Sequence, residues 1–248
     1  MAHALGVTRS ELLLRCMGDE APTGFSALVA RRAQHEPVAY ITGTQEFYGL
    51  SFRVTPEVLI PRADSEVLVE SALAAKPNAR RVLDCGTGSG ALLLAVLVHL
   101  AGAEGIGIDR SAGALAVATS NAGSLGLSER VRMIGADWTR AGWDAGLGRF
   151  DLILANPPYV ETDAELAPSV RDHEPAGALF AGPEGLDDYR LLIPQLPRLL
   201  APAGKAFVEI GASQAEAVCA LGRESGLATK VHFDLGERPR VVELSCSH

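Results

Sequence analysis

Residues 80–101, RRVLDCGTGSGALLLAVLVHLA, place a short apolar run, a glycine-rich turn and a second apolar run in succession. The first run predicts a buried strand, and ALLLAVLVHLA predicts the helix that follows the turn. Glycines between a strand and a helix allow a tight turn and let the backbone approach a ligand closely. This stretch therefore predicts the first unit of an α/β domain, with a nucleotide-like site at its turn.

The same strand, turn and helix order repeats towards the C-terminus. Alternating strands and helices predict a mostly parallel sheet that is covered on both faces. The last two strand-like runs are joined by a short connection, which favours an antiparallel edge. Pro194 and Pro197 interrupt a helical period over residues 186–200 and are expected to kink or break that helix. The strand-like runs are 105–109, 130–137, 150–156, 204–211, 228–234 and 240–245, and the expected helices include 111–123 and 213–225.

The first third of the chain has a different pattern. Thr8 and Glu11 have the spacing of a capping box, which predicts a helix start, and Phe25, Leu28 and Val29 give one apolar side to a second helix. Residues 45–54 predict a short hairpin, and Asp64 or Ser65 is expected to cap a further helix. We therefore expect a small helical domain with a hairpin over residues 1–76 and the α/β domain over residues 77–248.

Composition and charge narrow the class of protein. Hydrophobic residues make up 48% and charged residues 21% of the 248 positions, as in a globular protein with a full core. The net charge is −8 and neither part is basic, which disfavours tight binding to a phosphate backbone. The four cysteines show no metal-ligand spacing, so no metal site is expected. We expect a reduced, soluble, cytoplasmic protein that has no membrane segment and acts as a monomer.

Polar residues follow successive predicted strands at the edge where a nucleotide would bind. Asp84 precedes the turn formed by Gly86, Thr87, Gly88, Ser89 and Gly90, and Asp109 ends the next strand 25 residues later. A carboxylate in that place can accept hydrogen bonds from ribose hydroxyls. Asp137 and Trp138, after the third strand, supply an acceptor for an exocyclic amine and a ring that can stack on a purine. The turn has GxGxG rather than GxGxxG spacing, which favours S-adenosylmethionine over a dinucleotide.

Residues 150–160, FDLILANPPYV, end a strand in Asn156-Pro157-Pro158-Tyr159. Prolines lack an N–H group, and the residues before them are held extended, so the corner is rigid. Its free acceptors are the Asn156 side-chain oxygen and a main-chain carbonyl, which suit the two donors of a planar NH2 group. Tyr159 can lie against the flat group so held.

An amide or aryl amine is a weak nucleophile because its lone pair is delocalised. Holding its two hydrogens aims that lone pair at an electrophilic methyl group, and alignment of this kind can lower a barrier by about 7 kcal/mol or more. Transfer from a sulfonium spreads a charge that is already present, so a strong base is not required. The tetrapeptide behind a cofactor turn therefore predicts an amino or amide methyltransferase.

The chain resembles the HemK/PrmC family of protein-(glutamine-N5) methyltransferases, which are class I S-adenosylmethionine-dependent enzymes. The segments that resemble this family are PVAYITGTQEFYGLSFRVTPEVLIPRADSE, LDCGTGSG, NPPY, EPAGALFAGPEGLDDYR and VEIGASQ. The resemblance implies a Rossmann-like seven-stranded sheet whose last strand is antiparallel, with an N-terminal helical domain and a linking hairpin. It also implies methyl transfer to the side-chain amide nitrogen of the glutamine in the Gly-Gly-Gln motif of peptide chain release factors, with S-adenosylhomocysteine as product.

The resemblance also implies roles by position. Gly86 to Gly90 would wrap the methionine end of the cofactor and Asp109 would take the ribose. Trp138 would border the adenine, Asn156 to Tyr159 would hold the glutamine amide, and Asn156 would also contact the cofactor. Ala63 and Ser65 stand where the release-factor branch has proline and threonine, in the segment expected to face the substrate.

Three other functions stay open. One is a glutamine methyltransferase acting on a ribosomal protein. A second is an adenine amino methyltransferase acting on nucleic acid, which the three basic and eight acidic residues between Asn156 and Leu200 disfavour. The third is a cofactor-binding protein without activity, which the intact Asp84, Asp109 and tetrapeptide disfavour. Arg62 is expected either to cap a carbonyl or to meet the substrate, and Arg238 and Arg240 are expected to be structural or surface charges.

Overall fold

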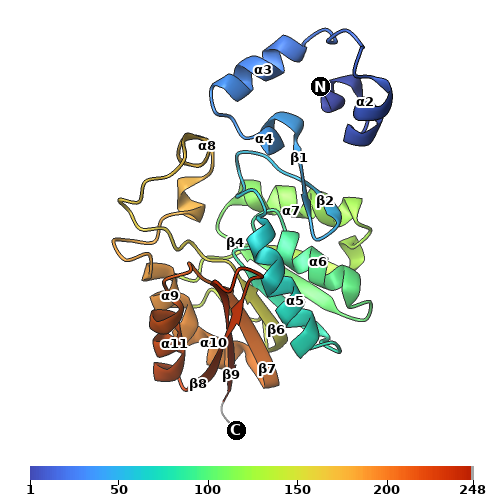
Figure 1. Cartoon of the computed structure of the whole chain (residues 1–248). Coiled ribbons are helices and arrows are strands. Elements are labelled where there is room, and N and C mark those ends of the chain that lie inside the picture. The colour runs from blue at the N-terminus through green and yellow to red at the C-terminus, as the bar shows by residue number, and fades with distance from the viewer. Residues whose placement is uncertain (247–248) are drawn as a thin grey trace.

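A computed structural model describes residues 1–246 (Figure 1). Its main feature is a seven-stranded sheet in the order β5-β4-β3-β6-β7-β9-β8. Each short apolar run that the sequence predicts to be a strand of this sheet forms a strand. The strands are β3 (Arg81–Cys85), β4 (Glu104–Asp109), β5 (Val131–Gly135), β6 (Phe150–Ala155), β7 (Leu200–Glu209), β8 (Leu227–Phe233) and β9 (Pro239–Cys246).

Six of the seven strands run in the same direction. β3 pairs in parallel with β4 and β6, and the parallel pairs continue to β5 on one side and β7 on the other. Only β9 is antiparallel, and it pairs with both β7 and β8. The predicted Rossmann-like sheet with an antiparallel last strand is therefore confirmed. Parallel strands also bring the carboxyl ends of β3 to β7 to one edge of the sheet, where the predicted site residues follow them.

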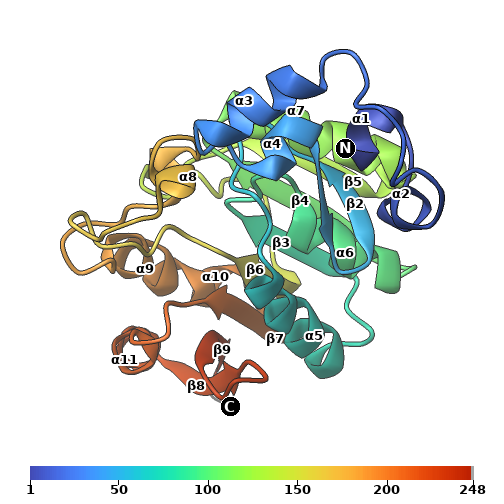
Figure 2. The same ribbon diagram turned by 45° about the horizontal axis from the view of Figure 1, so that its top comes forward.

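Helices cover both faces of the sheet (Figures 1 and 2). On one face lie α5 (Glu66–Ala75), α6 (Ala91–His99) and α7 (Ala112–Ser124). On the other lie α9 (Asp187–Leu192), α10 (Leu196–Leu199) and α11 (Ala215–Glu224). Each face has its own apolar cluster of buried side chains, as burial of a sheet on both faces requires. The helical period over 186–200 is broken where Pro194 and Pro197 predict it, with a 3₁₀ turn at Ile193–Gln195 between α9 and α10.

The N-terminal part contains α1 (Ala2–Leu5), α2 (Arg9–Arg15), α3 (Phe25–Ala33) and α4 (Val38–Thr42). α2 begins with the predicted capping box between Thr8 and Glu11. The hairpin of β1 (Thr44–Phe47) and β2 (Leu50–Arg53) follows, and its Phe47 and Phe52 are buried in the same cluster as α5 and α6. The hairpin thus packs on the helices beside the sheet, while α1 to α3 project beyond it (Figure 1).

The remaining elements are short. They are 3₁₀ turns at Ala63–Ser65 (η1), Ser128–Arg130 (η2) and Ala176–Ala178 (η3), and the single turn of α8 (Pro168–Arg171). η1 leads directly into α5, at the place where Asp64 or Ser65 was expected to cap the helix, although neither side chain makes a capping hydrogen bond. Across residues 1–246, none of the helices has the length and apolar character needed to cross a bilayer.

Candidate active site

The turn after β3 has a backbone that requires glycine. Gly86, Gly88 and Gly90 have φ values of +77°, +54° and +81°, in the left-handed region that disfavours other residues. At Gly86, a Cβ atom would also lie 3.0 Å from Cη2 of Trp138. The turn and the Trp138 ring therefore form one wall, which a side chain at position 86 would disrupt.

Asp84 lies beneath this turn and is fully buried. Its Oδ2 accepts a hydrogen bond of 2.7 Å from the Thr87 hydroxyl, while Oδ1 has no hydrogen-bond partner in the described chain. Burial raises the pKa of Asp84 to about 7, and the Thr87 hydroxyl opposes this rise. A buried carboxylate with a free oxygen is a place where a cationic ligand group would be favourable.

Asp109 ends β4 beside the turn. Its Oδ2 accepts from the Gly88 backbone N–H at 3.0 Å and its Oδ1 from that of Ser111 at 2.9 Å. Each carboxylate oxygen can accept more than one hydrogen bond, so Asp109 keeps acceptor capacity for ligand hydroxyls. The two backbone contacts hold the carboxylate in a fixed orientation at the edge of the site.

Asp137 and Trp138 follow β5. The Asp137 carboxylate accepts from the backbone N–H and hydroxyl of Thr139, and these bonds lower its pKa. The Trp138 indole N–H donates to Asp188 at 3.0 Å, which fixes the plane of the ring. Sequence reasoning did not identify Asp188 because it lies 50 residues away along the chain.

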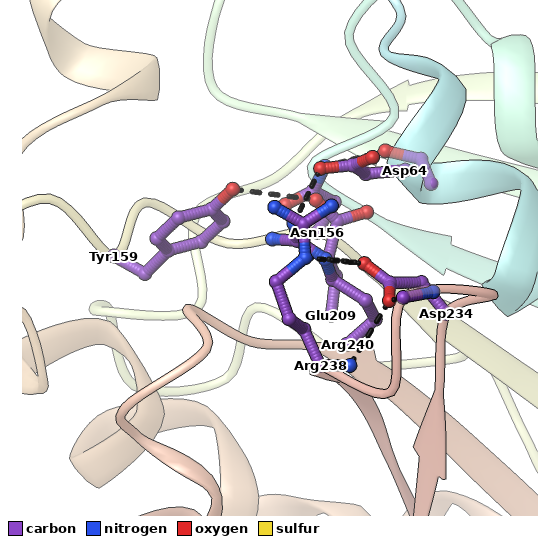
Figure 3. A network of polar contacts seen from close by, with 9 residues as sticks. Asp64, Asn156, Tyr159, Glu209, Asp234, Arg238 and Arg240 are labelled. Carbon is purple, nitrogen blue, oxygen red and sulfur yellow. Dashed lines mark hydrogen bonds and ion pairs between the residues drawn. The ribbon is translucent and has the colours of Figure 1, made fainter.

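The tetrapeptide leaves the sheet at the carboxyl end of β6. The Asn156 amide nitrogen donates to the Ser65 hydroxyl at 3.5 Å. Tyr159 turns its hydroxyl to Glu209 at 3.4 Å, and burial raises the Tyr159 pKa. Figure 3 shows Asn156, Tyr159 and Glu209 gathered near Arg240. The backbone N–H of Tyr159 donates to the Leu179 carbonyl, and this hydrogen bond holds the backbone at the end of the tetrapeptide.

A cavity of about 240 Å³ brings most of the predicted residues together. Its lining includes nine of them: Gly86, Thr87, Gly88, Ser89, Asp109, Asp137, Trp138, Asn156 and Pro158. Asp84, Gly90, Pro157 and Tyr159 do not contribute to the lining. Gly90 instead precedes α6, where a Cβ would lie 3.0 Å from Leu94 Cδ1 and 3.3 Å from Ala118 Cβ.

Two walls of the cavity come from segments that the strand pattern did not identify. One is the linker after the hairpin, residues 56–62, and the other is the loop at 175–178. Arg62 forms an ion pair with Glu174, whose side chain is 1% exposed and also accepts from the Ile60 backbone N–H at 3.2 Å. Arg110 donates to the Gly177 carbonyl at 2.7 Å. These contacts tie the loop to the linker and to the end of β4.

Two family models match the chain. The PrmC N-terminal domain matches residues 1–43, and a methyltransferase domain matches residues 76–223. The chain is 44% identical to the release factor glutamine methyltransferase of Caulobacter vibrioides, over 96% of this chain and 84% of that one. It is 45% identical to the enzyme of the same description from Geobacter sulfurreducens, over 91% and 80% of the two chains. The chain belongs to the release factor glutamine methyltransferase family. It is therefore a class I methyltransferase, and its methyl donor is S-adenosylmethionine.

Solved structures with low sequence identity share the fold of this family member. The hMettl16 catalytic domain in complex with MAT2A 3'UTR hairpin 1 gives a TM-score of 0.65 at 14% identity, over 91% of this chain and 92% of that one. The ribosomal protein L11 methylase of Lactobacillus delbrueckii subsp. bulgaricus gives 0.54 at 22% identity, over 79% and 86% of the two chains. At these identities the likeness concerns the methyltransferase fold alone.

The residues present fit the donor of this family. Asp109 and Trp138 line the cavity and offer an acceptor and a ring at successive strand ends. Asp84 lies outside the lining, buried next to the turn, and its carboxylate charge would favour a cationic methionine end bound at that turn. Among residues 1–246 no cluster of His, Cys, Asp and Glu side chains could hold a metal ion. Asn156 and Pro158 of the tetrapeptide, with Arg62 and Ser65, line the same cavity.

Proposed function

We propose that this chain transfers the methyl group of S-adenosylmethionine to the side-chain amide nitrogen of the glutamine in the Gly-Gly-Gln motif of a peptide chain release factor. The observation that carries the proposal is the shared cavity. One cavity joins the glycine turn, Asp109 and Trp138 to Asn156 and Pro158 of the tetrapeptide. The relatives named above are described as release factor glutamine methyltransferases, which supports this substrate.

The tetrapeptide would hold the glutamine amide through acceptors. The side-chain oxygen of Asn156 and a carbonyl of the rigid proline pair would each accept one hydrogen of the NH2 group. With both hydrogens held, the nitrogen lone pair is directed out of the amide plane and into the cavity. Alignment of this kind would supply about 7 kcal/mol or more of barrier lowering in favourable cases.

The other end of the cavity would hold the cofactor. Gly86 to Ser89 would surround its methionine end above Asp84, Asp109 would accept from the ribose, and Asp137 and Trp138 would contact the adenine. When bound, S-adenosylmethionine supplies a methyl group on a positively charged sulfur, which needs no acid or metal to be electrophilic. The chain's own contribution is therefore to orient the amide. Release of the amide proton to solvent completes the reaction.

The small domain would recognise the protein substrate. We propose that residues 1–76 form this substrate-binding domain and residues 77–248 the catalytic domain. Leu13, Leu14 and Met17 are exposed on and just after α2, at 58%, 81% and 69%, and offer apolar contact area to a partner. Release factors act on ribosomes, so the reaction is placed in the cytoplasm. We propose a monomeric enzyme, since the cavity is complete within one chain.

The test is transfer of labelled methyl from S-adenosylmethionine to separate acceptors. A release factor, the same factor with its Gly-Gly-Gln glutamine changed to alanine, ribosomal proteins and RNA are each offered to the enzyme. We expect label on the intact factor and none on the glutamine variant. Label on a ribosomal protein alone would mean that the enzyme methylates a protein other than a release factor, and would refute the proposed substrate. Label on RNA alone would mean that the tetrapeptide holds a base, and would refute the proposal.

The variant Asn156→Ala separates an enzyme from a binding protein that lacks activity. We expect it to retain S-adenosylmethionine, because the turn and Asp109 are unchanged, and to lose turnover. Retained turnover would show that Asn156 does not hold the acceptor.

A further inference from the structure

Gln214 is a buried polar residue at the end of the segment VEIGASQ, and the reaction described above does not use it. It is 9% exposed and lies directly before the first residue of α11. A polar side chain in this place commonly caps its own helix by accepting from the first backbone N–H groups. Within the described chain, Gln214 makes no such hydrogen bond. Its amide bonds other parts of the molecule instead.

The Gln214 amide joins three segments at the carboxyl edge of the sheet. Its Nε2 donates to the Tyr159 carbonyl at 3.0 Å and to the Gly185 carbonyl at 3.1 Å. Its Oε1 accepts from the Gly211 backbone N–H at 3.0 Å. A carbonyl only accepts and a backbone N–H only donates, so these partners fix which end of the amide is the NH2 group. Both hydrogens of that group are used.

Two glycines approach this amide closely. A Cβ at Gly185 would lie 2.8 Å from Gln214 Nε2, and a Cβ at Gly211 would lie 2.9 Å from Gln214 Oε1. The same Cβ at Gly211 would lie 3.6 Å from Cδ2 of the Tyr159 ring. The first two distances are too short for a side chain, so the close approach requires glycine. The surrounding backbone therefore leaves the Gln214 amide little room to move.

The prolines of the tetrapeptide make Tyr159 the first place after Asn156 at which its backbone can donate. Proline has no N–H group, so the first N–H after Asn156 belongs to Tyr159. It donates to the Leu179 carbonyl at 3.1 Å. This N–H lies in one planar peptide group with the carbonyl of Pro158, a residue that lines the cavity. The bond to Leu179 therefore also fixes the direction of the Pro158 carbonyl.

The next peptide group, formed by the Tyr159 carbonyl and the Val160 N–H, is held from both sides. Its N–H donates to the Leu179 carbonyl at 2.8 Å, and its carbonyl accepts from Gln214 Nε2. Leu179 holds one side of the plane and Gln214 the other. Loss of the Gln214 donor would leave a buried carbonyl without this partner, and the group could turn. Such a turn would shift the tetrapeptide that precedes it.

We propose that Gln214 is a positioning residue, whose NH2 group holds the tetrapeptide backbone so that its acceptors keep a fixed spacing for the glutamine amide. Gln214 lies outside the cavity lining, so it acts through Tyr159 and not on the substrate itself. This inference rests on the proposed function, because the spacing matters only if the tetrapeptide holds an acceptor. It goes beyond the proposed function by assigning a role to a residue of α11's entry turn.

The first test compares Gln214→Met with Gln214→Glu at pH 8. Met has a similar length and no N–H group, and we expect it to lower kcat by about 10-fold to 100-fold, as misplacements of about 1 Å do. Its affinity for S-adenosylmethionine in calorimetry should be unchanged, because the glycine turn and Asp109 are untouched.

Gln214→Glu keeps an acceptor for the Gly211 N–H, but a carboxylate cannot donate to Tyr159. It should therefore lose kcat to a similar extent. If Gln214 served only the entry into α11, Gln214→Glu would keep wild-type kcat, and that result would overturn the inference.

Val218→Ala is the matched control for stability. Val218 is fully buried one turn further along α11, and its backbone N–H donates to the Gln214 carbonyl. The smaller side chain should destabilise the packing of α11 without removing a hydrogen bond to the tetrapeptide. We expect wild-type kcat when the rate is expressed per cofactor-binding site counted in calorimetry. A loss as large as that of Gln214→Met would mean that destabilisation alone explains the effect, and would overturn the inference.

The second test is a double-mutant cycle with Asn156→Ala. If Gln214 acts through the tetrapeptide, Gln214→Met should have little further effect on the residual kcat of Asn156→Ala. Equal losses of kcat in both backgrounds, or wild-type kcat in Gln214→Met, would overturn the inference. Wild-type enzyme that does not label a release factor would instead refute the proposed function, so the two failures are distinguishable.

Discussion

Asp84 is expected to release a proton when the cofactor binds. Burial raises its pKa from 3.8 to about 7 in the ligand-free chain. This difference of about three pKa units corresponds to about 4 kcal/mol for ionising Asp84, at about 1.4 kcal/mol per unit. Asp84 does not line the cavity, but its carboxylate is bonded to Thr87 of the turn, so the charge of a cationic methionine end bound at the turn should favour the carboxylate form. Binding should release about 0.9 proton at pH 6, about 0.5 at pH 7 and about 0.1 at pH 8.

Calorimetric titration with S-adenosylmethionine measures this release directly. At each pH the titration is done in two buffers with different ionisation enthalpies, and the change in observed enthalpy gives the number of protons released. Asp84→Asn cannot ionise and should abolish the buffer dependence. Glu209→Gln is the matched control, because burial raises the pKa of Glu209 to about 7 as well but Glu209 lies outside the turn. This control should keep the full release.

Equal enthalpies in both buffers at pH 6, or the same buffer dependence in Asp84→Asn, would refute the reasoning. A measurement of stability against pH independently checks that the pKa of Asp84 is raised in the folded chain. A carboxylate with a raised folded-state pKa stabilises the fold below its unfolded pKa near 4, and this stabilisation is lost as pH rises through 7. Ligand-free wild type should therefore lose up to about 4 kcal/mol relative to Asp84→Asn between pH 4 and pH 8, in urea denaturation.

Three substitutions test other parts of the site. Arg62→Ala should lower the free energy of unfolding by about 2 kcal/mol in urea denaturation, because it leaves Glu174 buried without a counter-charge. Adding Glu174→Gln to Arg62→Ala should recover part of the loss, and equal stability of the wild type and both variants would contradict this. Gly86→Ala should lower the free energy of unfolding by about 1–2 kcal/mol, because position 86 has a φ of +77°. The folded variant should also bind the cofactor more weakly in calorimetry, because its Cβ would press on Trp138 at 3.0 Å; unchanged affinity would refute that contact. Gly185→Ala would place a Cβ against the Tyr159 carbonyl oxygen, so this variant should lose turnover and stability. The part of it that folds should bind the cofactor normally. Full activity in the methyl-transfer assay would contradict this prediction.

Sequence patterns predicted the order of the strands in the chain and the edge of the sheet at which most of the candidate site residues line one cavity. The apolar runs, the glycine turn and the capping box of Thr8 and Glu11 are local signals, so they could be identified without contacts. The cap expected from Asp64 or Ser65 is not formed, because the chain enters α5 through the 3₁₀ turn η1. Pro194 and Pro197 act on their own helical turns, and the break between α9 and α10 lies where they predict it. The carboxyl-edge site follows from parallel pairing, which gathers Asp109 and Asn156 at one edge.

Contacts between distant segments could not be predicted in this way. Arg62 and Glu174 are 112 residues apart, and Ser65 and Asn156 are 91 apart. No sequence periodicity or motif relates such distant positions. Their contacts depend on the path that the linker takes across the folded domain. The sequence left a structural or a surface role open for Arg240, and its guanidinium forms ion pairs with Asp64 in η1 and with Asp234 in the turn between β8 and β9 (Figure 3).

The position of β9 has a consequence for the order in which the protein is made. β9 follows β8 in the chain, yet it lies between β7 and β8, and within residues 1–246 it is the sole strand that β8 pairs with. When β8 leaves the ribosome, β7 therefore still has an open edge and β8 has no strand to join. An open strand edge is a site for pairing with other chains. Because Glu209 is in register with Val241 on β9, the carboxyl edge that carries the site is completed only after these late residues have been synthesised.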